Sequence, residues 1–326
     1  MREQDEIIIG IRKSQLSTAQ ADDFQSKLIQ ASEIYNNNGS IYIKYIKTSG
    51  DIHSNHRLDQ LGGKGLFVKE IEDQLLSGHV HIGIHSVKDL PAKETQGLKI
   101  VCWLERLSPN DALISNSNLS LKDLPAGSVV GTSSIRRRSQ ILSVRKDLRI
   151  KLLRGNVDTR IQKLENGEYD AIILSYAGLI RLKKDHLISD LFSVNEFLPA
   201  SCQGAVGIQI TNENDNSELL STLSKINHQF TEITCSAERE VLKSINANCN
   251  SPVSVYASIN ENEISIQCQL FDHNGFLLFN ELISEKVENS TILAQELGRK
   301  IIDKVGQEKI NELDILNDDF NYTPSS

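Results

Sequence analysis

The sequence has no long apolar run, few cysteines and few aromatic residues, and each shortage argues against a class of protein. None of its apolar runs approaches the roughly 20 residues of a membrane-spanning helix. Five cysteines without a CxxC pair argue against a disulfide framework and a zinc motif, so no metal site is predicted. The opening MREQDEIIIG is not a secretory signal, and a reducing cytoplasm is the expected compartment.

The composition is that of a globular chain of two or three domains. The chain has 326 residues, of which 39% are hydrophobic and 24% charged, so a mainly disordered chain is not expected. Its net charge is −8 and its aromatic content is 5%. A nucleic-acid binder would need a broad basic face and stacking aromatic side chains, so no nucleic-acid partner is predicted.

Positive charge is concentrated in one stretch of an otherwise acidic chain. Between Gly131 and Arg160 there are seven Arg and two Lys against two Asp, whereas the rest of the chain holds 26 basic and 41 acidic residues. Such a stretch favours a pocket for a small polyanion, because guanidinium groups bind carboxylates and phosphates through paired hydrogen bonds. The alternative is an ordinary solvated helix face.

Short apolar segments alternate with helical patterns over the first two-thirds of the chain. Helices are predicted between the apolar segments. Two of them are predicted from helical spacing at 16–29 and 66–76. Two more begin after cap residues at 132–134 and 156 and end at Ile141 and Leu164. The strand–helix–strand order, which occurs twice, predicts two α/β domains with largely parallel sheets. Strands are predicted at 7–9, 41–46, 80–86, 128–131, 148–153 and 169–174.

The last third has a different pattern. Helical segments at 237–245 and 291–305 flank three alternating segments, which are separated by polar turns. This order predicts a small α+β domain with a three-stranded antiparallel sheet. The tail after Asp314 is acidic and polar and is expected to fray. The three predicted strands are 253–259, 263–270 and 276–283.

Unusual polar residues follow the predicted strands. Open parallel sheets bind ligands beyond the carboxyl ends of their strands, where helix N-termini add N–H donors. A cleft between two such domains would suit a ligand with several carboxylates or phosphates. Its arginines would be Arg12, Arg136, Arg137, Arg154 and Arg160.

Other chemistries are less well supported. The loop Gly62–Gly65 lacks the Walker A pattern GxxxxGK[ST]. His85 and Ser86 are neighbours on a strand and point to opposite faces, so His85 is not expected to activate a serine nucleophile. Asp89 is interpreted as an ionised carboxylate that serves a cationic reacting centre, or else as a helix cap or salt-bridge partner.

The cysteines fall into two groups. Cys249 lies in a polar loop and is a nucleophile, an attachment point or simply exposed, while Cys202 is ambiguous. The other three, which are interpreted as packing residues, are Cys102, Cys235 and Cys268.

Seven motifs stand in order along nearly the whole chain. They are GIRKSQLSTAQA, GGKGLFVKEIE, HSVKDLP, GTSSIRRRSQ, LRGNVDTRIQKLENGEYDAIILS, QGAVGI and the SAERE that precedes Cys249. In this order they resemble the porphobilinogen deaminase family, also called hydroxymethylbilane synthase. The family commonly has two glycines where Ala247 and Asn248 stand, but the spacing from Cys249 to Pro252 is kept.

The resemblance implies a fold of two periplasmic-binding-protein-like (type II) α/β domains with an interdomain cleft, followed by a small α+β domain. It places domain 1 at 1–104 with 200–222, domain 2 at 105–199 and domain 3 at 223–326. It also implies a cytoplasmic, monomeric transferase of porphyrin and heme biosynthesis. This enzyme deaminates four porphobilinogen molecules, links them head to tail on a covalent dipyrromethane cofactor, and releases hydroxymethylbilane with water.

The resemblance also assigns residue roles. The catalytic residues would be Asp89, Lys88 and Arg12, and Cys249 would carry the cofactor through a thioether. The growing chain presents an acetate and a propionate on each pyrrole, which suits the arginines. Residues that would bind substrate or cofactor are Ser14, Gln20, Lys64, Phe67, Ser86, Thr132, Ser134, Arg136, Arg137, Arg154, Arg160, Gln203 and Gly204.

Two rival functions would each account for part of the sequence. A binding protein with the same two-lobed fold would explain the arginines but not Cys249 or Asp89. A nucleic-acid binder that uses the arginines 136–138 would need strong salt-dependent affinity for oligonucleotides. A covalent two-pyrrole adduct on the denatured protein would separate the enzyme from both.

Overall fold

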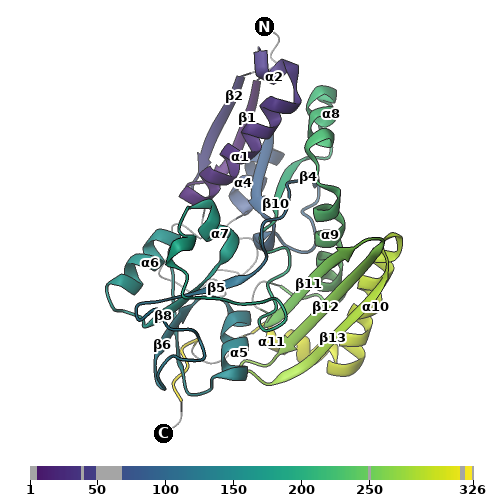
Figure 1. Ribbon diagram of the computed structural model, residues 1–326. Coiled ribbons are helices and arrows are strands. Elements are labelled where there is room, and N and C mark those ends of the chain that lie inside the picture. The colour runs from purple at the N-terminus through teal and green to yellow at the C-terminus, as the bar shows by residue number, and fades with distance from the viewer. Residues whose placement is uncertain (1–5, 38–39, 49–67, 249–250, 316–319, 325–326) are drawn as a thin grey trace. The chain divides into compact units, whose positions relative to one another are not determined.

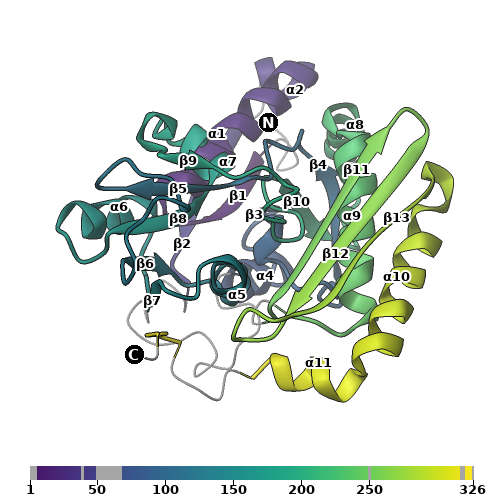
Figure 2. The same cartoon turned by 60° about the horizontal axis from the view of Figure 1, so that its bottom comes forward.

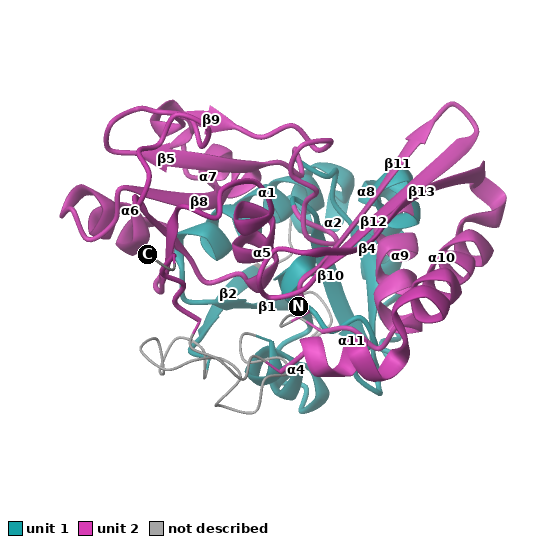
Figure 3. Ribbon diagram, turned by 90° about the horizontal axis from the view of Figure 1, so that it is seen from below, with its two compact units in different colours: residues 1–107, 204–233 teal, residues 108–203, 234–326 magenta. Residues whose placement is uncertain are grey.

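The computed structural model describes residues 6–37, 40–48, 68–248, 251–315 and 320–324. Three of the predicted site residues, Lys64, Phe67 and Cys249, lie outside these residues. The chain forms two compact units, which Figure 3 shows in different colours. Unit 1 comprises residues 1–107 and 204–233, and unit 2 comprises 108–203 and 234–326.

Unit 1 contains one five-stranded sheet with helices (Figure 1). Helix α9 (Gln229–Ser244) begins in this unit and ends in the other. The remaining elements of unit 1 are β1 (Glu6–Arg12), α1 (Gln15–Ala31), α2 (Glu33–Asn37), β2 (Ser40–Ile46), α4 (Lys69–Leu76), β3 (Ile82–Ser86), the short 3₁₀ helix η3 (Val87–Asp89), β4 (Leu98–Trp103), β10 (Val206–Thr211) and α8 (Ser217–Ile226).

The strand order of this sheet is β2-β1-β3-β10-β4. Strands β1, β2 and β3 run parallel, while β10 runs antiparallel to both β3 and β4. Strand β10 belongs to the segment that returns to unit 1 after residue 203. The sheet is therefore largely parallel, as the sequence predicts, and the carboxyl ends of β1 and β3 lie at one edge.

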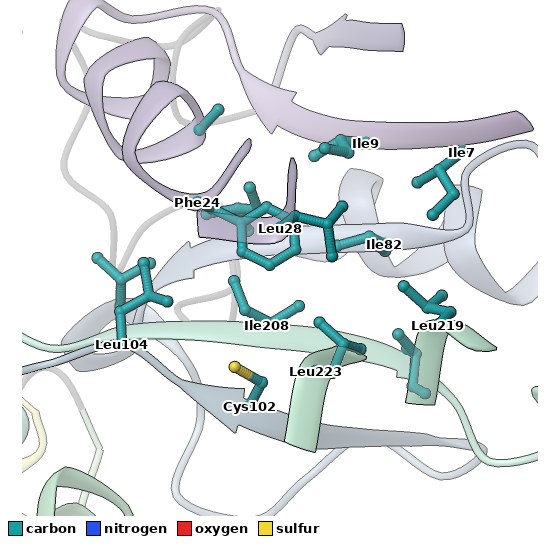
Figure 4. Packing of buried hydrophobic residues seen from close by; sticks show 14 of the residues in the cluster. Ile7, Ile9, Phe24, Leu28, Ile82, Cys102, Leu104, Ile208, Leu219 and Leu223 are labelled. Atoms are coloured by element: carbon teal, nitrogen blue, oxygen red, sulfur yellow. The ribbon is translucent and has the colours of Figure 1, made fainter. Parts of the chain in front are cut away.

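The core of unit 1 explains how α1 is held on the sheet. Gln20, Phe24 and Leu28 are four residues apart, so they lie on one face of the helix, and all three are buried. Phe24 and Leu28 pack in one cluster with Ile9 of β1 and Ile208 of β10, among others (Figure 4). Burial of each large apolar side chain contributes about 1.5–3 kcal/mol. This apolar stripe fixes the position of Gln20 on the same face.

Unit 2 contains a second five-stranded sheet and a three-stranded sheet. The elements around the five-stranded sheet are β5 (Asp111–Ser115), β6 (Val129–Thr132), α5 (Ile135–Val144), β7 (Arg149–Leu152), α6 (Val157–Glu165), β8 (Ala171–Ser175), α7 (Tyr176–Arg181), η4 (Asp185–Leu187) and β9 (Asp190–Leu191). Those of the C-terminal part are β11 (Val253–Asn260), β12 (Glu263–Phe271), β13 (Leu277–Lys286), η5 (Val287–Asn289), α10 (Ser290–Val305) and α11 (Gln307–Leu313).

The five-stranded sheet of unit 2 has the order β7-β6-β8-β5-β9 and repeats the plan of the first sheet. Strands β6, β7 and β8 run parallel, and β5 runs antiparallel to β8 and β9. In both sheets the antiparallel strand belongs to a segment that starts after the chain has changed units. The matching strand orders confirm the expectation of two α/β sheets built on the same plan.

The C-terminal sheet has the order β11-β12-β13 and is antiparallel throughout. Helix α10 lies along this sheet, as Figure 2 shows, and contacts β12 and β13. Leu293, Leu297 and Ile301 recur every four residues on α10 and are buried. The predicted α+β part with a three-stranded sheet is therefore confirmed. No helix among the described residues is long and apolar enough to span a membrane.

The expectation of a frayed tail is wrong for residues 320–322. Phe320 is only 4% exposed and belongs to a core cluster of unit 2. Tyr322 pairs with Ile150 of β7 through two backbone hydrogen bonds of 2.9 and 2.8 Å. The two aromatic side chains give this acidic segment enough apolar surface to dock, which the overall polarity of the tail concealed.

Candidate active site

In unit 1, the residues that follow β1 begin the first helix. Arg12 ends the strand and Ser14 caps α1, because its hydroxyl accepts a 3.1 Å hydrogen bond from the backbone N–H of Ser17. One turn into the helix, the buried Gln20 donates from Nε2 to Oγ of Ser86 at 2.8 Å. This bond ties the start of α1 to the end of β3, so the two predicted site segments of unit 1 meet.

The segment Ser86–Asp89 forms the end of β3 and the short helix η3. Backbone pairing with β10 holds it, because Val206 lies opposite Ser86 and the N–H of Val87 donates to Ala205. Asp89 is half-buried. Among the described residues its side chain forms no hydrogen bond or ion pair, so the alternatives of a helix cap and a salt-bridge partner find no support. The carboxylate lies just after the carboxyl end of β3, the end at which open parallel sheets generally bind ligands.

A buried polar network lies beneath this segment. Burial lowers the pKa of His85 to about 4 and outweighs an opposing interaction with the Gln209 side chain, so the imidazole is neutral near pH 7. Gln209 of β10 donates to Oε1 of Glu72 at 2.9 Å, and Thr95 donates to Oε2 at 2.7 Å. His85 is therefore a buried, neutral side chain.

In unit 2, two hydroxyls shape the N-terminus of α5. Thr132 ends β6, is fully buried, and accepts a 3.1 Å hydrogen bond from the N–H of Ser134. Ser134 caps the helix by accepting from the N–H of Arg137, which confirms the predicted capping segment. This arrangement turns the chain sharply from strand to helix and brings the arginines of α5 inside the fold.

The arginines of α5 are buried around Asp111, the first residue of β5. Arg136 donates from one terminal nitrogen to Oδ2 at 2.7 Å, and Arg137 donates from Nε and a terminal nitrogen to Oδ1 at 3.0 and 2.6 Å. Gln203 also donates to Oδ1, at 2.9 Å. Arg136, Arg137 and Arg138 are 4%, 6% and 3% exposed, so the alternative of a solvated helix face is wrong for these three residues.

Charge balance at Asp111 follows from this geometry. Burial by itself disfavours the carboxylate, but the charges of Arg136 and Arg137 outweigh that cost and hold the pKa of Asp111 below its ordinary value. Sequence reasoning missed this residue. One feature of the sequence could have identified it: Asp111 is an acidic residue at the start of the apolar run 111–115. Buried arginines need a negative charge nearby, and a buried acidic residue can supply it.

Two further arginines follow β7. Arg154 lies in the loop before α6, and Arg160 on α6 donates from Nε to the carbonyl of Gly155 at 2.7 Å. Asn156 caps the helix by accepting from the N–H of Thr159 at 2.9 Å, as predicted. Both arginines are half-buried, unlike those of α5, so their side chains reach the surface of unit 2.

The described ends of the loop that carries Cys249 are anchored on Asp314, a residue that sequence reasoning did not select. Asn248 donates from Nδ2 to Oδ2 of Asp314 at 2.8 Å, and the hydroxyl of Ser251 donates to Oδ1. The N–H of Asn248 also donates to the Ser251 hydroxyl at 2.9 Å. Asp314 therefore fixes both ends of the loop.

The three cysteines interpreted as packing residues are all fully buried, as a packing role predicts. Burial raises the pKa of the Cys102 thiol to about 12, with a smaller contribution from Glu232, and burial also raises the pKa of Cys268. Neither thiol is a reactive nucleophile near neutral pH.

Two family models together match most of the chain. One, "Porphobilinogen deaminase, dipyromethane cofactor binding domain", matches residues 7–219, and the other, "Porphobilinogen deaminase, C-terminal domain", matches residues 232–303. The chain belongs to the porphobilinogen deaminase family. It therefore contains the dipyrromethane-binding domain that gives the first model its description.

Named relatives agree with this assignment. The porphobilinogen deaminase of Bacillus pumilus is 40% identical over 307 residues, which cover 92% of this chain and 97% of that protein. The porphobilinogen deaminase of a Wolbachia from Drosophila simulans is 41% identical over 297 residues, which cover 91% and 98%.

Solved structures show a more distant likeness. A Salmonella typhimurium periplasmic binding protein with high arginine specificity aligns with a TM-score of 0.39 and 12% identity, over 68% of this chain and 92% of that one. A Pseudomonas putida periplasmic solute-binding protein with bound D-glucuronate also gives 0.39 and 12%, over 74% and 82%. The family assignment rests on the sequence matches.

Proposed function

We propose that this porphobilinogen deaminase is a transferase in which Asp89 is the central catalytic carboxylate. The observation that carries the proposal is the position of Asp89. It lies half-buried on the helical turn after β3 and has no side-chain partner among the described residues. Departure of ammonia from porphobilinogen leaves positive charge on the pyrrole, and a nearby carboxylate stabilises that charge. The same carboxylate can accept the pyrrole N–H and help move a proton to the departing amine.

The other residues of unit 1 are proposed to position the substrate. Arg12 and Lys88 supply positive charge for its acetate and propionate groups. Ser14, Gln20 and Ser86 supply polar groups at the same sheet edge, and the Gln20–Ser86 hydrogen bond supports their assignment to one site. Lys64, Phe67 and Gly204 retain the binding roles implied by the family motifs.

In unit 2, Arg154 and Arg160 are the proposed carboxylate-binding side chains, because both are half-buried beside the N-terminus of α6. Arg136 and Arg137 keep a proposed binding role, for which Nε of Arg136, a buried atom without a hydrogen-bond partner, is an available donor. The terminal nitrogens that do not contact Asp111 donate to the carbonyls of Leu198 and Ile173. Three neighbours are proposed to complete this cluster: Thr132, Ser134 and Gln203.

The residues present fit a covalent dipyrromethane cofactor. A polycarboxylate group needs cations and N–H donors, and the ends of β6 and β7 in unit 2 offer both. We propose that Cys249 forms the thioether, in the loop whose ends Asp314 anchors. When bound, the cofactor supplies a pyrrole carbon that accepts the first substrate unit. The chain's own residues would then bind each added pair of carboxylates.

We also propose a domain organisation, an oligomeric state and a cellular compartment for the chain. The domains are proposed to span 1–104 with 200–222, 105–199 and 223–326. The chain is proposed to act as a monomer in the cytoplasm, on a small-molecule substrate and without nucleic acid or membrane partners. Four porphobilinogen units would be joined head to tail before hydrolysis releases hydroxymethylbilane.

Mass spectrometry of the denatured protein tests the cofactor assignment. The expected result is a covalent two-pyrrole adduct that peptide mapping places on the segment 248–252, and that Cys249→Ser abolishes. Cys268→Ala is the matched control, because it removes a buried thiol of unit 2 and should leave the adduct in place. An adduct on Cys202, or fully active protein without any adduct, would contradict the assignment.

A further inference from the structure

Three potential metal ligands meet in unit 2. The sulfur atoms of Cys202 and Cys235 and a carboxylate oxygen of Glu238 all lie within 4.8 Å of one another. The three side chains are 1%, 0% and 0% exposed. The two cysteines are 33 residues apart in sequence, so they do not form a short metal-binding motif that could be recognised in the sequence.

The backbone conformation of Cys202 is a second observation that points to a functional role for its thiol. Its φ is +56°, in the left-handed region that favours glycine. A side chain other than glycine or asparagine is disfavoured there, because its Cβ crowds the following carbonyl oxygen. The fold nevertheless places a cysteine at this position and directs its sulfur toward the carbonyl of Cys235, at 3.5 Å. Backbone strain of this kind clusters at functional sites.

The carboxylate of Glu238 is already oriented for a ligand. One oxygen accepts the N–H of Cys202 and the other accepts the N–H of Ala257 at 2.9 Å. These two bonds fix the orientation of the carboxylate beside the two cysteine sulfur atoms. Cys235 and Glu238 are three residues apart on α9, which places their side chains on one face of the helix.

We propose that Cys202, Cys235 and Glu238 form a binding site for one Zn²⁺ ion. Zn–S bonds of about 2.3 Å in a tetrahedral site place two sulfur atoms about 3.8 Å apart, and Zn–O bonds are about 2.0–2.2 Å. The 4.8 Å limit of the cluster admits both separations. Water takes the fourth position. Binding converts both thiols to thiolates, so two protons leave for each ion that enters.

A Zn²⁺ ion at this site would connect two segments of the chain where it passes between the units. Cys202 stands just before the chain leaves unit 2 at residue 203, and Cys235 stands just after the chain returns at residue 234. A Zn²⁺ ion at this site would tie the departing segment to the returning one. Binding to the folded state alone must also raise thermal stability.

Zinc titration of the full-length protein, in a phosphine reductant, tests the proposal. Competition with a chromophoric chelator measures affinity, pH-stat titration counts released protons, and Cd²⁺ reports thiolate ligation by its ultraviolet charge-transfer band. Wild type is expected to bind one ion, release about two protons and gain thermal stability. Cys202→Gly should fold well, because glycine suits the left-handed backbone.

The variants decide the assignment. Cys202→Gly and Cys235→Ser should weaken Zn²⁺ binding by more than the about 10–100-fold typical of losing an outer-shell partner. Cys268→Ala, which removes an equally buried thiol, should bind like wild type. Equal affinity in wild type and Cys202→Gly would overturn the proposal. So would a Cys202–Cys235 disulfide in place of metal binding, or loss of binding in Cys268→Ala. None of these measurements depends on catalytic activity.

Discussion

Replacement of Asp111 by asparagine should destabilise the protein strongly. The side chain is fully buried and accepts hydrogen bonds from Arg136, Arg137 and Gln203. Asparagine keeps the volume but removes the only negative charge in these bonds. Breaking a buried ion pair on one side typically costs about 3–5 kcal/mol, because the remaining charge is left uncompensated. With two arginines affected, we expect a loss of at least about 3 kcal/mol in the free energy of unfolding.

Urea unfolding at pH 7, followed by circular dichroism, measures this loss. Asp147→Asn is the matched control, because Asp147 pairs with Arg145 at the surface and its removal should leave the urea midpoint nearly unchanged. If Asp111→Asn also left the midpoint unchanged, the carboxylate would contribute little to stability. The account of α5 as a helix whose buried arginines depend on Asp111 would then be refuted.

The pH dependence of the same pair of proteins provides a second readout. The pKa of Asp111 is lower in the folded protein than its ordinary value, which is about 3.9 in an unfolded chain. Its stabilising contribution is therefore complete above about pH 4 and declines as the pH falls toward the folded-state pKa. The stability difference between wild type and Asp111→Asn should shrink below about pH 4 and stay constant from pH 5 to 7.

Three further predictions concern unit 2. Arg137→Leu should slow substrate incorporation and, combined with Asp111→Asn, lower stability by less than the sum of the single changes, since the two residues share hydrogen bonds; additive urea midpoints would contradict this coupling. Phe320→Ala should cost about 3 kcal/mol in urea unfolding, because the ring is buried and lies 6.0 Å from the guanidinium of Arg138; a frayed tail would give no change. Gly275→Ala should lower the melting temperature more than Gly306→Ala does. Both glycines have positive φ, but an added Cβ at Gly275 would lie 2.5 Å from a backbone atom of Ser143, whereas at Gly306 it meets open space; equal shifts would show that the hairpin does not pack tightly on α5.

Secondary-structure elements with a simple hydrophobic period can be predicted from the sequence alone. The β1–α1 and β6–α5 units and the three-stranded sheet show clear alternation or cap residues, and the structure has them where they are predicted. The sequence patterns do not predict strands β4, β5, β9 and β10. Strand β10 pairs with segments about 100 residues away in sequence, and no local pattern reveals such a partner.

The residues of the candidate site also fall into a group that the sequence predicts and a group that it does not. Residues at strand ends and helix caps could be predicted because backbone geometry places them, as for Arg12, Ser14 and Ser134. Charge partners could not, because Asp111 meets the arginines of α5 only through the tertiary fold. The same holds for Asp314, which anchors a loop more than 60 residues before it in the chain.

The proposed role of Asp89 is most directly tested by single-turnover elongation in an Asp89→Asn variant that carries the cofactor. The change keeps the size of the side chain and removes its charge, so the variant should have a wild-type urea midpoint and near-normal substrate affinity. Removal of a dominant electrostatic stabiliser typically lowers the rate by about 10²–10³-fold, and elongation should fall by that factor. A folded Asp89→Asn variant that adds porphobilinogen units at nearly the wild-type rate would contradict the central claim.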